Sequence, residues 1–507
     1  MTRLLLQVLL PSLFLCGAQS RECQAGESLV VPYTRVPGDA TSENFSVRVN
    51  GMQVEAAHLA LNVGYTHFAF RGSVRVEIAV REPIRTFDLS PHRAQIEAKV
   101  DGKVLSFELR RPQKLHLTVN KLPRFFLFAE PVEDSPEGSR GALDLLSFGI
   151  QSDLDRVQTA AIQWAIDTAS AEKKTLIVPP GVYRCGELKL KSNLTLYLSP
   201  GAVLKGTGRI DDYPSGPLGT QQIDLTDCRN VRIFGPGVID GQGRALRLAT
   251  KNSSAGRMKL VRSLRAVDCT VEGVILRDSG TWGVHLVESE NLRFTNCKLI
   301  SNTIHDDREF PWESKTDGFD PDNSSRIVIE NGFVSCNDDA IAVKLRHGVR
   351  RDIQDVQFRN NVVWTVKSAL KIGSETAERR LSDVVFEGND VVHADRGIVV
   401  YNYFGGNVEK CRWIDNHFEF IGGDLKKMQV EIKIQDEEGR GRIAQLLLKD
   451  NFFEREAENH SRIQGLDAEH EVDDVVFENF VVAGEPRTSA ATARVQVSRN
   501  VRKVEFK

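Results

Sequence analysis

The sequence predicts an all-β protein in which a small antiparallel β-sandwich precedes a long solenoid of stacked β coils. Between residues 27 and 120, short alternating runs such as NFSVRV and GKVLSFELRR are separated by Gly, Pro or Asn turns. Farther along, the pattern of strand, bend and strand recurs, as in VQFRNNVVWT and VVFEGNDVVH, about 28 residues apart. This period suits a solenoid better than a propeller, whose blades need roughly 40 residues or more.

The first 20 residues are expected to be a signal peptide. MTRLLLQVLLPSLFLCGAQS has an early arginine, a short apolar run and small residues suited to signal peptidase. We therefore expect a secreted or periplasmic protein with no membrane attachment after the signal is removed. The chain has 507 residues and a net charge of −3, which gives no basic surface for nucleic acid. A monomer is expected.

The rest of the chain divides into a β-sandwich domain at 21–130, a linker at 131–147 and the solenoid at 148–507. The linker contains the acidic and Gly-containing stretch EDSPEGSRGA. One amphipathic helix is predicted at 153–171. The residues expected to face its core side are Val157, Ala160, Ala161, Trp164 and Ala165.

Asparagine recurs at the predicted bends, where it tolerates a left-handed backbone and its side chain can stack through hydrogen bonds. The positions are Asn331, Asn360, Asn389, Asn416, Asn451 and Asn479. Cysteines show no CxxC or Cys/His spacing typical of a metal site, and several fall in strand patterns. We expect buried thiols, no metal and no cofactor.

Acidic residues stand among strand-forming residues between 314 and 344. Asp338 and Asp339 are adjacent, and in a stacked coil Asp317 would lie about one strand spacing, roughly 4.8 Å, from them. Adjacent strand residues point to opposite faces, so the pair can converge only if the backbone bends near Asn337. Clustered carboxylates repel one another and raise each other's pKa, which suits proton-transfer chemistry. A turn that binds backbone amides, or a calcium site, is the alternative for this pair.

Three motifs carry a resemblance to a known family. TDGFD at 316–320, NDDAIAVK at 337–344 and ALKIGSE at 369–375 resemble glycoside hydrolase family 28, the polygalacturonases. The sandwich and the run PRFFLFAEP also resemble family 49, the dextranases and isopullulanases. The resemblance implies a right-handed parallel β-helix and an inverting mechanism. It assigns Asp338 as general acid and Asp317 with Asp339 as the pair that activates water.

Two departures from the family pattern bear on the substrate. Ser368 stands where polygalacturonases carry the histidine of a GHG motif. Val399 and Tyr401 occupy the positions of the Arg-x-Lys clamp that binds the substrate carboxylate. The resemblance therefore implies the acidic triad but not specificity for a uronate.

Further residues near the triad are candidates for contact with a sugar. Aromatic and imidazole side chains suit stacking and hydrogen bonding, and cations suit a carboxylate or hydroxyl. The candidates are Trp282, His285, Lys344, Lys371, Arg396, Tyr401 and Tyr403. Asp320, followed by a proline, is expected in a structural turn. A loop at 305–312 is expected to wall the cleft, with a metal site at His305, Asp306 and Asp307 as a weaker alternative.

The sequence thus predicts an exported, cofactor-independent inverting glycoside hydrolase acting on a polysaccharide. Two alternatives stay open. A polysaccharide lyase on the same fold would need a uronic substrate, often calcium, and an Arg or Lys base. A non-catalytic carbohydrate-binding or adhesion solenoid would not need the intact acidic triad.

Overall fold

A computed structural model describes residues 28–507 except 60–62, 140, 217, 252, 302–314, 347 and 350. The expected signal peptide, Cys23, the predicted loop at 305–312 and its alternative metal site lie outside the described residues. Within the part of the chain that is described, no helix is both long and apolar enough to cross a bilayer.

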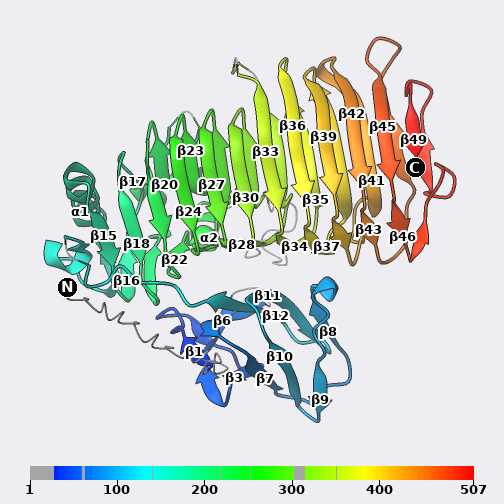
Figure 1. The fold of residues 1–507 in the computed structure, drawn as a ribbon. Helices are drawn as coiled ribbons and strands as arrows, with labels where there is room; N and C mark the ends of the chain where they lie inside the picture. The colour runs from blue at the N-terminus through cyan, green and yellow to red at the C-terminus, as the bar shows by residue number, and fades with distance from the viewer. Residues whose placement is uncertain are drawn as a thin grey trace, which may run out of the picture.

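Two sheets form the N-terminal sandwich (Figure 1). In the smaller sheet, strands β3 (Phe45–Val49) and β7 (Val74–Val80) alternate buried and more exposed residues, so this sheet turns one apolar face inward. The larger sheet contains β1 (Leu29–Pro32), β2 (Ala40–Thr41), β5 (Ala56–Leu59), β6 (Val63–Arg71), β8 (Phe87–Ser90), β11 (Gln113–Val119) and β12 (Arg124–Pro131). The smaller contains β3 (Phe45–Val49), β4 (Met52–Val54), β7 (Val74–Val80), β9 (Lys99–Asp101) and β10 (Val104–Leu109).

Three parallel sheets then wind into the right-handed β-helix that the sequence predicts. The first contains β13 (Leu143–Asp144), β15 (Thr175–Val178), β18 (Thr195–Leu198), β21 (Arg232–Phe234), β24 (Val267–Glu272), β27 (Glu290–Thr295), β30 (Ser325–Glu330), β33 (Ile353–Arg359), β36 (Arg380–Glu387), β39 (Asn407–Ile414), β42 (Arg442–Lys449), β45 (Val472–Glu478) and β49 (Val504–Phe506).

The second sheet faces the sandwich. It contains β14 (Asp153–Val157), β16 (Gly181–Arg184), β19 (Ala202–Lys205), β22 (Val238–Asp240), β25 (Ile275–Arg277), β28 (Lys298–Ser301), β31 (Phe333–Cys336), β34 (Val362–Thr365), β37 (Asp390–His393), β40 (His417–Phe418), β43 (Phe452–Phe453), β46 (Val481–Val482) and β47 (Glu485–Pro486).

The third sheet, called here the site sheet, carries the candidate site. It contains β17 (Leu188–Lys189), β20 (Gln221–Thr226), β23 (Lys259–Leu264), β26 (Val284–Val287), β29 (Phe319–Asp322), β32 (Ile341–Leu345), β35 (Ser368–Thr376), β38 (Arg396–Phe404), β41 (Met428–Gly439), β44 (Ser461–Gln464) and β48 (Val495–Val497).

The strand register gives the coil period. Phe358 pairs with Phe386, as the repeat spacing predicts, and Phe386 pairs in turn with Trp413. The second step is one residue shorter than the first, so the length of the coils varies around the predicted period. The aligned rings stack inside the helix, with 5.3 Å between the centroids of Phe386 and Trp413.

Asparagines at the bends fall into two groups, one with stacked side chains and one with a left-handed backbone, and the sequence pattern did not distinguish them. A ladder of buried side chains runs through Asn361, Asn389, Asn416 and Asn451. At each step the backbone N–H and the side-chain amide of one asparagine donate to the Oδ1 of the next. Asn331, Asn360 and Asn479 instead adopt the left-handed backbone conformation one residue before the ladder position of their coil. The predicted stacking thus applies to 389, 416 and 451, and Asn361 joins them in place of Asn360.

The predicted helix is shorter than expected, and its buried face is only partly the predicted one. Helix α1 (Thr159–Glu172) caps the β-helix, and residues 153–157 form strand β14 instead. The buried residues of α1 are Ile162, Ala165, Ile166 and Ala169, which confirms Ala165, and Ala161 is partly buried against the core. Val157, Ala160 and Trp164 are exposed, contrary to the prediction, because Val157 belongs to a strand and the helix packs through Ile162 and Ile166. A second helix, α2 (Gly243–Ala249), lies between β22 and β23.

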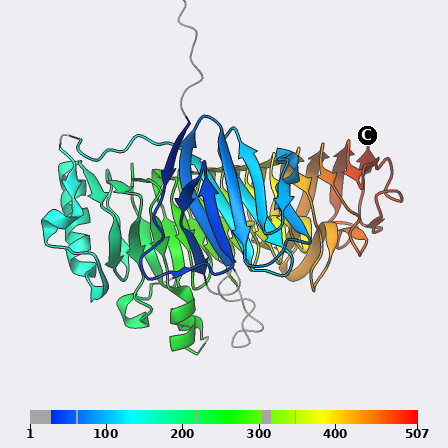
Figure 2. The same cartoon turned by 90° about the horizontal axis from the view of Figure 1, so that it is seen from below.

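The sandwich packs against the second sheet, as Figures 1 and 2 show. Phe126 and Phe128 of β12 contact Phe333 of β31, with ring centroids 4.8 and 5.1 Å apart. Arg277 of β25 bridges Asp39 and Asp240 at 2.6 Å each. The site sheet is therefore left uncovered by the sandwich. The six described cysteines are buried and free, which confirms the expected buried thiols.

Candidate active site

Asp317 lies beside the Asp338–Asp339 pair, as the coil argument predicts. The backbone N–H of Gly318 donates to the carbonyl of Asp339 at 2.9 Å, so the two acids stand on neighbouring coils. A Cβ at Gly318 would lie 2.3 Å from the carbonyl oxygen of Ala340, so this close approach requires glycine. The pair itself lies in the bend between β31 and β32, not inside a strand.

Asp339 is held as a carboxylate. Lys371 Nζ donates to its Oδ2 at 2.6 Å, and the backbone N–H of Ser368 donates to its Oδ1 at 3.0 Å. Burial by itself raises the pKa of this group, but Lys371, and after it Arg396, hold the pKa well below its usual range. Both oxygens are bound, so the orientation of the carboxylate is fixed.

The pKa of Asp338 is shifted in the opposite direction, upward. Burial raises its pKa, and the neighbouring Asp339 carboxylate raises it further. Its side chain is 16% exposed, and Lys367 Nζ approaches no closer than 4.0 Å. The hydroxyl of Thr365 donates to the Asp338 carbonyl and fixes the bend. The pKa values of the two adjacent carboxyls are therefore shifted in opposite directions, because among the described residues only Asp339 has a cation within 3 Å.

Asp317 and Asp320 share one lysine. Lys344 Nζ lies 3.3 Å from Asp317 Oδ2 and 2.8 Å from Asp320 Oδ1. Burial nevertheless raises the pKa of Asp320 to about 6, and burial followed by Asp320 raises that of Asp317 well above its ordinary value. The structure corrects the expectation for Asp320. This residue lies in β29, fully buried, and not in a turn.

Trp282 and His285 belong to the coil before Asp317. Lys344 Nζ lies 3.7 Å from the centroid of the Trp282 ring, a cation–π contact that fixes the ammonium beneath the indole. His285 is 1% exposed, and its Nε2 lies 3.1 Å from Asp322 and 2.8 Å from Arg346. The His285 imidazole is therefore buried and held in place by Asp322 and Arg346.

A tyrosine pair lies on the opposite side of the triad. Tyr401 and Tyr403 stack with centroids 5.3 Å apart, and Lys433 Nζ lies 4.5 Å from the Tyr401 ring. Arg396 donates to the Tyr401 hydroxyl at 3.1 Å, and that hydroxyl donates to Glu431. Sequence reasoning missed Glu431 and Lys433. The alternation of MQVEIKIQ at 428–435 was their only signal, because the register that brings them beside Tyr401 is not visible in the sequence.

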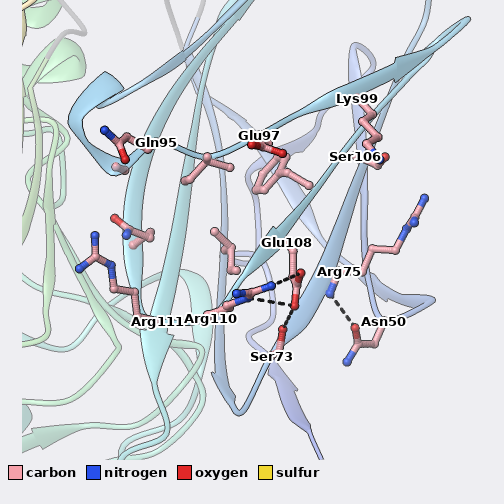
Figure 3. Close-up of a pocket in the computed structure, with 15 residues that line it drawn as sticks. Asn50, Ser73, Arg75, Gln95, Glu97, Lys99, Ser106, Glu108, Arg110 and Arg111 are labelled. Carbon is pink, nitrogen blue, oxygen red and sulfur yellow. Dashed lines mark hydrogen bonds and ion pairs between the residues drawn. The ribbon is translucent and has the colours of Figure 1, made fainter.

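Other concave and metal-like features lie away from the triad. A groove of about 940 Å³ in the sandwich is lined by residues including Arg75, Lys99 and Arg110, and its Glu108 is already bound by Arg110 and Ser73 (Figure 3). Among the described residues, Asp88, His92 and Glu419 are close enough to hold a metal ion. Both ring nitrogens of His92 already have partners, because Nε2 lies 2.7 Å from Asp88 and Nδ1 lies 2.8 Å from Glu454. Neither feature includes a residue of the triad.

Comparison with known proteins places these residues in a family context. The model of the family described as glycosyl hydrolases family 28 matches residues 169–431, which include the triad. A polygalacturonase from Ralstonia nicotianae is 28% identical over 313 residues, 50% of this chain and 57% of the relative. An exo-poly-alpha-D-galacturonosidase from Dickeya chrysanthemi is 24% identical over 321 residues, 50% of this chain and 51% of the relative. The chain thus spans about half the length of these relatives.

Solved structures share the fold over more of the chain. Dex49A from Penicillium minioluteum superimposes with a TM-score of 0.66 at 12% identity, covering 94% of this chain and 96% of that one. An exopolygalacturonase from Thermotoga maritima superimposes with a TM-score of 0.58 at 22% identity, covering 74% of this chain and 93% of that one. At these identities the likeness concerns the fold, including the sandwich in the first case.

Proposed function

Because the chain belongs to glycosyl hydrolase family 28, we propose that it is an exported glycoside hydrolase that cleaves polysaccharide with inversion of configuration. The observation that carries the proposal is the unequal surroundings of two adjacent acids: Lys371 Nζ lies 2.6 Å from Asp339, whereas Lys367 Nζ stays 4.0 Å from Asp338. These surroundings favour the ionised form of Asp339 and the protonated form of Asp338. Inverting hydrolysis needs one carboxylic acid and one carboxylate flanking the scissile bond.

In this mechanism Asp338 donates a proton to the glycosidic oxygen as the bond to the anomeric carbon breaks. Asp339 accepts a proton from the water that attacks the opposite face of the sugar. The raised pKa of Asp317 favours its protonated form, so Asp317 is proposed to orient the water by hydrogen bonding and not to share the role of base. The tyrosine pair, beside Lys433, provides a surface on which a sugar ring can stack.

The substrate is proposed to be a neutral α-linked glycan or a mixed pectic chain. The two positions of the expected uronate clamp hold Val399 and Tyr401, and two nearby cations, Lys344 and Lys371, are paired with acids of the site. An unpaired buried carboxylate of a substrate would cost several kcal/mol.

Screening pectic, dextran-type and galactan polymers for release of reducing ends tests the activity, and NMR of the first product gives its anomeric configuration. We expect the anomer opposite to the substrate linkage. Retention would contradict the mechanism. Unsaturated, ultraviolet-absorbing ends would indicate a lyase, and binding without cleavage would indicate an adhesion solenoid.

A further inference from the structure

Lys371 and Asp339 form a buried ion pair that links two coils of the site sheet. Their side chains are 9% and 7% exposed, and 2.6 Å separates Nζ from Oδ2. Lys371 lies on β35 and pairs in register with Ala342 of β32, the strand that follows the Asp339 bend. The lysine therefore reaches the acid from the next coil, and among the described residues its ammonium is the nearest cation to the carboxylate.

We infer that Lys371 is the positioning residue that keeps Asp339 ionised and aimed as the base, an inference that rests on the proposed function. A buried carboxylate close to Asp338 and Asp317 would otherwise take up a proton, because burial and like charges both favour the neutral form. Without Lys371, Asp339 would keep the Ser368 backbone N–H and the smaller effect of Arg396, which together are weaker than a hydrogen-bonded ammonium group. With Lys371 present, the proton shared among the three acids resides on Asp338 or Asp317.

The position of Lys371 also accounts for the apolar residue beside it. In register, Lys371 pairs with Val399, which is fully buried. An arginine at 399 would stand one strand spacing away, roughly 4.8 Å, and like charges directly opposite on neighbouring strands are destabilising. The charge of Lys371 thus disfavours a second cation at 399, and Glu431, which pairs with Val399 on the other side, would offset part of that repulsion.

The pH dependence of kcat/KM in Lys371→Met and Lys371→Arg tests the role on a polymer that the wild type cleaves. Removing the ammonium raises the pKa of Asp339, so the acidic limb of the profile should move to higher pH by at least about one unit. Lys371→Arg should restore most of the wild-type limb. Lys449→Met, an exposed lysine paired with Glu478 on another sheet, is the matched control. An unmoved limb with equal loss at every pH, or a raised KM with unchanged kcat, would overturn the inference.

A double-mutant cycle supplies a readout that needs no activity. Lys371→Met should lower the urea midpoint in the wild-type background and lower it much less in Asp339→Asn, where no charge is left to pair. Equal losses in both backgrounds would overturn the ion pair. If the wild type cleaves no polymer while the cycle shows coupling, the proposed function fails and the pairing of the two residues stands.

Discussion

The ammonium group of Lys344 lies 3.3 Å from Asp317 and 2.8 Å from Asp320. The same ammonium group contacts the face of the Trp282 ring. A second lysine, Lys371, forms an ion pair with Asp339 from the next coil. The buried negative charge of the site is thus largely balanced by the protein itself. Within the described part of the chain, the cation nearest to Asp338 is Lys367, at 4.0 Å, so Asp338 is the acid left to exchange its proton with a substrate.

Asp338→Asn should remove the general acid. We expect kcat to fall by roughly 10² to 10⁴ on substrates with poor leaving groups, since an amide cannot donate the required proton in the same way. Because Asp338 is the most exposed of the three acids, the variant should keep the wild-type unfolding midpoint. Kinetics on a substrate with an activated leaving group are the control, and they should show a much smaller loss. Full activity in the folded variant would refute the assignment.

Unesterified polygalacturonate should be a poor substrate. Lys344, Lys371 and Arg396 were the candidates for replacing the missing clamp, but the first two are ion-paired to site acids and Arg396 lies against Asp395 and Tyr401. Catalytic efficiency measured on polygalacturonate, its methyl ester and neutral α-glucans decides the question. Efficiency on the unesterified polymer above that on every neutral polymer would show that another group binds the carboxylate.

His92 should make the stability of the protein depend on pH. A hydrogen bond to Asp88, the charge of Glu419 and a hydrogen bond to Glu454 raise the pKa of His92 to about 9 from 6.5. A raised folded pKa gives stability that is fully present below 6.5 and is lost as the pH rises through 9. Urea unfolding of His92→Gln should therefore show a loss near pH 6 that shrinks near pH 10, in keeping with this shift. A loss that is independent of pH would exclude the charged imidazole as its cause.

Asn361 and Asn360 are adjacent but should respond differently to substitution. The Asn361 side chain is fully buried, accepts from Gly332 N at 2.8 Å and donates to the Ile329 carbonyl at 3.1 Å. Asn361→Ala should cost about 1–3 kcal/mol of unfolding free energy because these backbone groups lose their partner. Asn360→Gly keeps the left-handed backbone at an exposed position and should change stability by less than roughly 0.5 kcal/mol. Similar losses in both variants would contradict the ladder.

The sequence alone was sufficient for the class of fold and for the triad. A repeat of strand, bend and strand at a regular period is compatible with few architectures, because each coil can bury its apolar face only against the next coil. The motifs around Asp317, Asp338 and Asp339 lie near one another in the chain, and one coil separates them in space, so their convergence follows from the period.

Only the tertiary structure decided which groups surround the triad. Asp320 looked like a turn residue because a proline follows it, yet its neighbours across the sheet make it part of a strand. Glu431 meets Tyr401 through contacts between coils whose lengths vary, as the Trp413 register shows. Which acid keeps a proton depends on burial and on the distance to Lys344 or Lys371. These quantities arise from packing between coils, and no local pattern in the sequence encodes them.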